Sequence, residues 1–239
     1  MKNTILLVCL LALCNLTLFA QTGTNWLEGA GLGTAGASQR PTAKALRVVR
    51  TDKKPATHVP PQEAPAALKK IYSNLGKSKT DLYTDNAGWY VAGPNAVDQP
   101  WEFIAMPFTP KSNSHVSQVQ AALLYDSSGA NQVNLSIYGD TGGAPGTLLA
   151  GPVTVTNLPT YPFCCTLAVA NFSPVAVTAG AQYWVVADTP LTGQGSDFEG
   201  NWQFVVATIL QGANVPPFGW YSFDVGPEQA AGEVLGTIP

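Results

Sequence analysis

The sequence predicts an all-β protein, an antiparallel two-sheet sandwich of the jelly-roll type. Short runs of apolar, β-branched and aromatic residues, several of them alternating with polar ones, recur from residue 71 to residue 225. Clusters of Gly, Asn, Asp, Ser and Pro separate these runs, and long helical periodicity is missing. Period-two runs between turn clusters are typical of antiparallel sandwiches rather than of βαβ units.

The first twenty residues predict export from the cell. Lys2 is followed by an apolar run from Ile5 to Leu13, and Ala20 supplies a small residue at the expected cleavage position. This run is too short for a membrane-spanning helix and has the order of a secretory signal peptide. We therefore expect a secreted or cell-envelope protein whose mature chain has no membrane span.

Residues 21–66 predict a disordered basic linker. Gly, Ala, Pro and Thr dominate and apolar periodicity is absent, so the segment cannot bury enough surface to offset the entropy of ordering. Eight basic residues against two acidic ones lie between Arg40 and Lys70. This charge fits a solvated linker, contact with an acidic envelope polymer, or folding back onto the acidic part of the chain. A proline ahead of good helix formers allows a short helix over residues 65–72.

The folded domain is expected over residues 67–239. Its apolar and alternating runs predict strands over residues 101–108, 119–126, 132–139, 146–156, 181–188, 201–209 and 219–225. The glycine-rich stretch 138–151 lacks the helix and the lysine that a phosphate loop needs. We interpret it as a connecting loop in which Asp140 caps the bend.

The charge of the folded part argues against polyanionic partners. No Lys or Arg follows Lys111, whereas eight acidic residues do. An acidic surface of this kind repels nucleic acid and phosphorylated ligands, so we expect no nucleic-acid partner.

Few residues offer catalytic or metal-binding chemistry. His58 lies in the linker, His115 lies in a serine-rich turn, and no G-x-S-x-G motif occurs, so neither a hydrolase triad nor a zinc site is expected. Asp197 and Glu199, beside Trp202, are the paired carboxylates that a glycosidase would need, and the same acids could bind calcium. The alternative is that both lie in a solvent-facing loop. No other cofactor is expected.

Two further features bear on function. Cys164 and Cys165 are adjacent and lie outside the signal peptide; a vicinal disulfide, two buried thiols and a bridge to another chain are the alternatives. Tyr161, Trp202 and Trp220 stand in loop-like sequence, where aromatic faces could stack on sugar rings while nearby acids accept hydroxyl hydrogen bonds. Otherwise they cap the ends of the sandwich.

Five ordered pieces resemble the choice-of-anchor R type domains of secreted bacterial proteins. They are "KKIYSNLG", "GWYVAGP", "VNLSIYGDTGGAPGTLLAG", "FCC" and "VTAGAQYWVVAD", and the resemblance covers about residues 70–235. It implies an extracellular β-sandwich module attached to the cell by a C-terminal sorting tail, with no known enzyme activity and no agreed ligand. The sequence ends "EVLGTIP", without an apolar tail or a basic cluster, which favours free secretion.

These observations lead to an expected function and two alternatives. We expect a secreted, non-catalytic β-sandwich that binds a glycan or another envelope component. The first alternative is a structural or protein-interaction module that uses a sheet face or edge. The second is a glycoside-active enzyme that uses Asp197 and Glu199.

Overall fold

The computed structural model describes residues 48–50, 68–98, 101–206, 218–219 and 229–239. These residues form strands and loops but no helix, and therefore no helix that is long and apolar enough to cross a membrane. The expected signal peptide and most of the expected linker lie outside the described residues.

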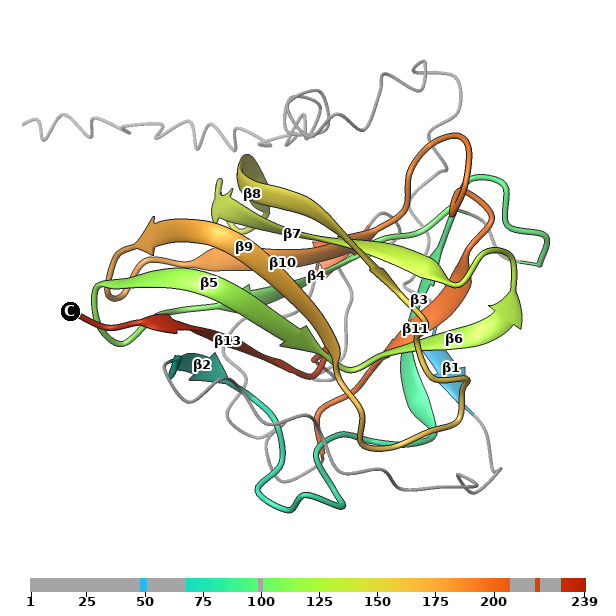
Figure 1. The fold of residues 1–239 in the computed structure, drawn as a ribbon, viewed down its shortest axis with the longest axis horizontal. Coiled ribbons are helices and arrows are strands. Elements are labelled where there is room, and N and C mark those ends of the chain that lie inside the picture. Colours follow the sequence, from blue (N-terminus) through green and yellow to red (C-terminus); the bar gives the residue numbers. More distant parts are fainter. Residues whose placement is uncertain (1–47, 51–67, 99–100, 207–217, 220–228) are drawn as a thin grey trace, which may run out of the picture.

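The strands form three antiparallel sheets. The first sheet has the order β1-β3-β11-β6, with bounds Val48–Arg50, Ala87–Ala92, Glu199–Gln203 and Leu123–Ser128. The second has the order β12-β4-β10-β7-β8, with bounds Phe218–Gly219, Ile104–Phe108, Tyr183–Asp188, Gln132–Asp140 and Pro145–Thr156. The third has the order β2-β13-β5-β9, with bounds Lys69–Ser73, Gly232–Thr237, Ser114–Ala121 and Ala168–Val177. The predicted all-β, antiparallel fold is confirmed (Figure 1).

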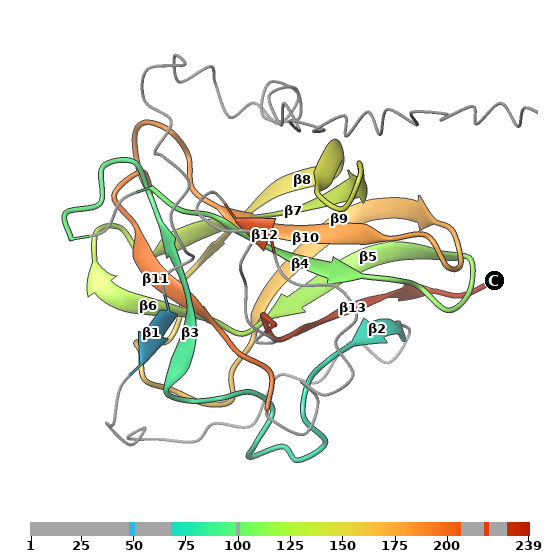
Figure 2. The same cartoon turned by 180° about the vertical axis from the view of Figure 1, so that it is seen from behind.

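The described strands group into three sheets rather than the expected two because one extended run changes partners. Strands β5 and β6 are separated by a single residue, Ala122. Its amide donates to the carbonyl of Ala231, 3.0 Å away, and its carbonyl accepts from Gln203, 2.9 Å away. Before Ala122 the run pairs with β13 and β9, and after it the run pairs with β11. The run 119–126 therefore contributes strands to both the first and the third sheet. Figure 2 shows these two sheets meeting along this run.

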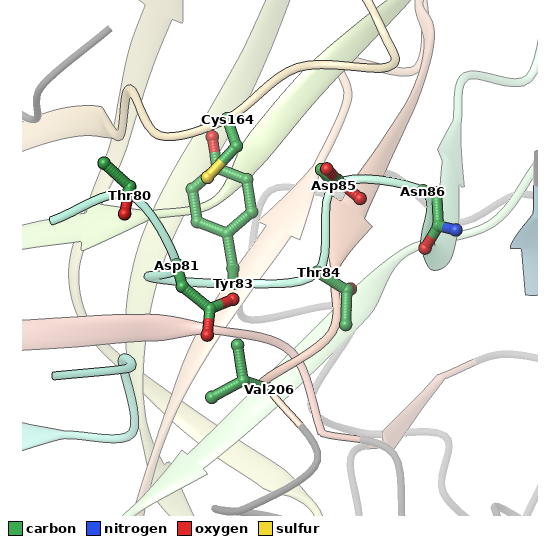
Figure 3. A pocket seen from close by; sticks show the side chains of 8 residues that line it. All are labelled: Thr80, Asp81, Tyr83, Thr84, Asp85, Asn86, Cys164 and Val206. Atoms are coloured by element: carbon green, nitrogen blue, oxygen red, sulfur yellow. The ribbon is translucent and has the colours of Figure 1, made fainter. Parts of the chain in front are cut away.

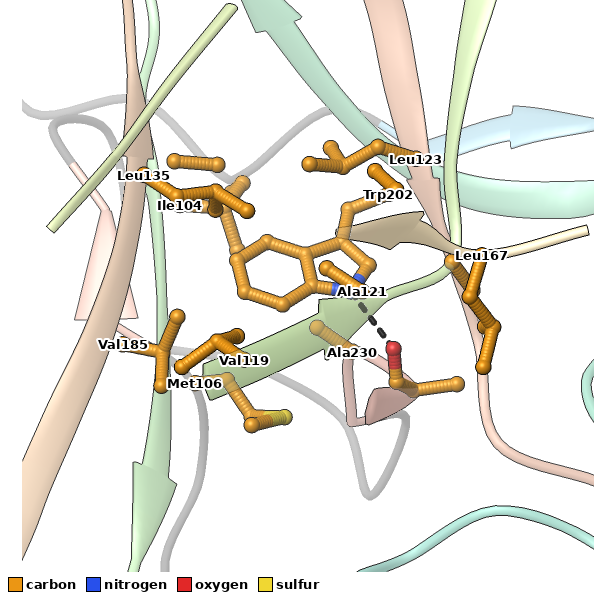
Figure 4. Packing of buried hydrophobic residues seen from close by; sticks show 14 of the residues in the cluster. Ile104, Met106, Val119, Ala121, Leu123, Leu135, Leu167, Val185, Trp202 and Ala230 are labelled. Atoms are coloured by element: carbon orange, nitrogen blue, oxygen red, sulfur yellow. Dashed lines mark hydrogen bonds between the residues drawn. The ribbon is translucent and has the colours of Figure 1, made fainter. Parts of the chain in front are cut away.

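One core joins the three sheets. Trp202 is fully buried at its centre, among side chains from β4, β5, β7 and β10 (Figure 4). Alternation along β10 divides that strand between two clusters: Val185 and Ala187 belong to this core, whereas Trp184 and Val186 belong to a smaller cluster on the other face. Period-two alternation with apolar residues on both faces is what the sequence of this strand predicts.

Two local predictions are wrong. Val48–Arg50, inside the expected disordered linker, form β1 and pair with β3. Residues 69–72, expected in a short helix, lie in β2 and pair with β13. In both cases hydrogen bonds to a distant strand outweigh a local preference, because intrinsic propensity is a weak prior beside tertiary pairing.

The glycine-rich stretch 138–151 contains the predicted bend, but only residues 141–144 lie outside strands; the remaining residues end β7 and begin β8, so the expectation of a connecting loop is wrong for them. The bend connects β7 to β8, and the carboxylate of Asp140 accepts from the amide of Gly143, 3.2 Å away. The same carboxylate accepts from the side chains of Gln182 and Trp184, both at 2.8 Å, and so fixes the turn against β10.

Candidate functional site

A cavity of about 350 Å³ opens beside the start of β3. Its polar lining comes from a single stretch that precedes β3: Thr80, Asp81, Thr84, Asp85 and Asn86. Tyr83, Cys164 and Val206 supply the apolar lining (Figure 3). Tyr83 and Cys164 are each only 1% exposed, so the cavity reaches down to the protein core.

The stretch "TDLYTDN" presents polar side chains to the cavity because its buried residues lie directly beside its exposed ones. Leu82 and Tyr83 are buried and anchor the stretch, whereas Asp81 is exposed and Asp85 is half-buried. The amide and hydroxyl of Thr84 both donate to the carbonyl of Phe204, at 2.9 and 3.1 Å. The polar side chains are thus presented from a backbone that is fixed at its centre.

Cys164 lines the cavity from the connection between β8 and β9, which spans residues 157–167. Cys164 and Cys165 are joined by a disulfide and are buried in the main core. The hydroxyl of Tyr83 donates to the carbonyl of Thr166, 2.9 Å away. The hydroxyl of Tyr161 donates to the carbonyl of Asn86, 2.8 Å away, which places this predicted site residue beside the cavity.

Two carboxylates, Asp126 and Asp85, act electrostatically on Tyr161. The pKa of its hydroxyl is raised, chiefly by burial and then by the negative charges of Asp126 and Asp85 and by Tyr90. Burial also raises the pKa of Asp126, and the charge of Glu199 raises it further. An anionic ligand approaching this region meets repulsion, whereas a ligand rich in hydroxyl groups finds acceptors.

The two predicted carboxylates accept hydrogen bonds from two different loops. Glu199 is buried in β11, and its Oε1 accepts from the amide of Asp98, 2.8 Å away. Asp197 is half-buried, and its Oδ1 accepts from the amide of Ala130, 3.1 Å away. The expectation of a solvent-facing loop is therefore wrong for Glu199, because strand pairing with β3 and β6 carries it into the sheet.

No cluster of metal-ligating side chains among the described residues supports calcium binding at Asp197 and Glu199. Within the described ranges, no group of three or more His, Cys, Asp or Glu side chains could hold an ion. Asp197 and Glu199 instead each accept a hydrogen bond from the backbone of a loop.

The three predicted stacking aromatics do not form one platform. Trp202 is 0% exposed, and its indole nitrogen donates to the carbonyl of Ala231, 2.7 Å away. It cannot stack on a ligand from solvent because it pairs with Trp89 on the core face of the first sheet. Trp220 lies outside the described residues. Tyr161 alone, of the three, is placed beside a cavity.

Sequence reasoning missed the polar wall of the cavity. Asp81, Asp85 and Asn86 are separated only by Leu82, Tyr83 and Thr84, directly ahead of the aromatic strand "GWYVA". Polar residues this dense beside two buried anchors were the available signal. These residues meet Cys164, which lies about eighty residues later in the chain, only in the folded protein. No local sequence pattern reveals a contact at that separation.

Comparison with known proteins adds no relative. No protein-family model matches the chain, and no curated protein matches it. The site therefore has to be interpreted from its own geometry.

Proposed function

We propose that this protein is a secreted, non-catalytic β-sandwich module that binds a glycan in the cavity between residues 80–86 and Cys164. The observation that carries the proposal is the composition of this cavity, which combines polar walls with an apolar floor. Sugar rings offer hydroxyl groups at their edges and C–H groups on their faces. Carboxylate, hydroxyl and amide groups suit the edges, and the lining from Tyr83 and Cys164 suits the faces.

The size and charge of the cavity narrow the class of glycan. At about 350 Å³ it falls at the small end of ligand pockets, so we propose that it holds one terminal sugar residue rather than the middle of a chain. Its described lining contains Asp81 and Asp85 but no Lys, Arg or His. The sugar is therefore neutral, because a sulfated or carboxylated sugar would lack a cationic partner.

Binding is favoured over catalysis by the exposure of the two acids. A glycoside hydrolase keeps one carboxyl group protonated, commonly by burying it, and places a second at a set distance. Asp81 is exposed and Asp85 is half-buried, so neither occupies a buried environment of that kind.

Secretion and the finer architecture belong to the same proposal. The expected signal peptide and a disulfide, which persists in oxidising compartments, both support export. The hydrogen bonds at Ala122 support joining the first and third sheets into one bent layer that faces the second, as in a jelly-roll sandwich. Membership in the choice-of-anchor R type family rests on the sequence resemblance alone.

A binding experiment tests the proposed function. We would measure the full chain against glucose, galactose, mannose, N-acetylglucosamine, cellobiose and chitobiose by calorimetry, after a first screen on a glycan array. Replacing Asp81 and Asp85 together with alanine should weaken binding about tenfold or more, because hydrogen bonds to charged groups contribute about 1.5–3 kcal/mol each. The matched control is Asp98→Ala, since this exposed acid lies beyond the opposite end of β3. Equal affinities for all three proteins, or no binding to any neutral sugar, would refute the proposal.

A second candidate function is supported by an exposed sheet edge. Strand β8 is twelve residues long and forms one edge of the second sheet. No described strand pairs with its outer side, and a sheet edge of this length can accept a strand from a partner protein. Self-association in light scattering, together with the absence of sugar binding, would favour this candidate.

A further inference from the structure

The disulfide and the cavity share one wall. Cys164 lines the cavity, and both cysteines are buried, at 1% and 0% exposure. Buried side chains are close-packed, so a change in the covalent state of this pair has to be accommodated by the backbone around it.

Two hydrogen bonds connect the disulfide segment to the polar wall, one on each side of the cysteines. Tyr161, three residues before Cys164, donates to the carbonyl of Asn86, and the carbonyl of Thr166, directly after Cys165, accepts from Tyr83. Both partners, Tyr83 and Asn86, line the cavity themselves. A shift of the cysteine backbone therefore acts on two lining residues, Tyr83 and Asn86.

Among the described residues, one backbone hydrogen bond of this segment runs from the amide of Tyr161 to the carbonyl of Tyr125, 2.8 Å away. The segment lies between the end of β8 and the start of β9, and its residues belong to no strand of the three described sheets. The covalent ring between neighbouring residues restricts the backbone torsions of that pair directly, in addition to the hydrogen bonds of the segment, each of which contributes about 1 kcal/mol.

We propose that the Cys164–Cys165 disulfide positions the wall of the cavity, so that the oxidised pair is required for full ligand affinity. The proposal rests on the proposed function, and it makes Cys164 and Cys165 positioning residues. Reduction breaks the S–S bond and adds two electrons and two protons, giving two thiols, while a dithiol reductant is converted to its own cyclic disulfide. The freed segment then releases the bonds to Tyr83 and Asn86, so the cavity lining loses these two supports while Thr84 keeps its bonds to Phe204.

The first readout needs no ligand. Hydrogen–deuterium exchange of the full chain is compared before reduction, after reduction with dithiothreitol, and after reoxidation, with mass mapping to distinguish Cys164–Cys165 from Cys9 and Cys14. We expect faster exchange in residues 80–86, reversed on reoxidation, and no change in the distant turn 139–146. Unchanged exchange in residues 80–86 while the pair is fully reduced would overturn the proposal.

The second readout is binding of the same panel of neutral sugars, with cellobiose and chitobiose as the extended probes. Loss of the two hydrogen bonds predicts an affinity about tenfold weaker after reduction. Tyr83→Phe, which removes one of the two bonds and keeps the ring, should weaken binding in the same direction without reductant. Equal affinity in the oxidised and reduced states would overturn the proposal. Absence of binding in both states would refute the glycan function, and the exchange experiment would still decide whether the disulfide positions the wall.

The double variant Cys164→Ser, Cys165→Ser provides the matched control for the reductant. It should resemble the reduced protein and should not respond to dithiothreitol. Circular dichroism checks that it is folded; if it is not, the reversible reduction of the unsubstituted chain carries the test alone.

Discussion

Asp188 is a buried acid whose replacement should stabilise the protein at neutral pH. It ends β10, opposite Asn134 of β7, and is 4% exposed. Its Oδ1 has no hydrogen-bond partner among the described residues. Burial raises its pKa from 3.8 to about 7, although a hydrogen bond with Asn134 acts in the opposite direction. We therefore predict that Asp188→Asn, which keeps the shape and removes the ionisation, stabilises the fold.

The magnitude follows from the difference in pKa. One pKa unit is worth about 1.4 kcal/mol, so ionised Asp188 costs the folded state about 4 kcal/mol. Because the pKa is higher in the folded chain, the favourable contribution is fully present below pH 3.8 and is lost as the pH rises through about 7. Burial raises the pKa of Tyr138, and the charge of Asp188 raises it further.

Urea unfolding between pH 4 and pH 8 measures this effect. The stability of Asp188→Asn relative to the unsubstituted protein should rise across this range by about 4 kcal/mol and level off near pH 8. The exposed Asp98→Asn serves as the control for an Asp-to-Asn substitution outside the core. A difference for Asp188→Asn that does not change with pH would show that Asp188 is not held in a site that disfavours its charge.

Two further substitutions test the core and its connection to β2. Trp202→Ala should cost about 3–5 kcal/mol of unfolding free energy, because it opens a cavity at the centre of the core and removes the hydrogen bond to Ala231; a loss below about 1 kcal/mol would contradict this position. Asn74 is buried and bonds to the carbonyl of Ala230 at 2.9 Å and the amide of Gly232 at 2.8 Å, so Asn74→Ala should cost about 2–3 kcal/mol in the same urea assay. An unaffected midpoint would show that these backbone groups find other partners.

The sequence predicted best where side-chain alternation coincides with strand pairing. The runs 132–139, 146–156 and 181–188 became β7, β8 and β10 almost residue for residue. Strands β7 and β8 pair as consecutive strands commonly do, whereas β10 pairs with β7 although β8 and β9 lie between them in the chain, and the sequence does not predict that pairing. The turn with Asp140 was predicted for the reason that the structure gives, a carboxylate that accepts from a backbone amide within its own bend.

Predictions failed where tertiary contacts decide the outcome. The helix expected over residues 65–72 was a local preference, and pairing with β13 outweighed it in residues 69–72. Trp202 follows Gly200 and Asn201, which resembles a loop, but register with Trp89 places it in the core. The first and third sheets exchange partners at Ala122, and alternation alone cannot reveal which neighbour a strand chooses.

The candidate site was only partly predictable. Tyr161 was singled out as a loop aromatic, and it does lie beside the cavity. Cys164 drew attention because of its adjacent partner, but its place in the wall depends on the fold. Asp81 and Asp85 went unnoticed because acids in a polar turn have no distinguishing pattern until the chain brings an apolar floor beneath them.

An amide-resolved titration tests the binding site most directly. Isotope-labelled protein is titrated with chitobiose and cellobiose while its backbone resonances are followed by nuclear magnetic resonance. Binding in the cavity predicts shifts that saturate and are concentrated in residues 80–86 and 164–166. Saturating shifts along β8 or on another surface, with residues 80–86 unaffected, would contradict the proposed site.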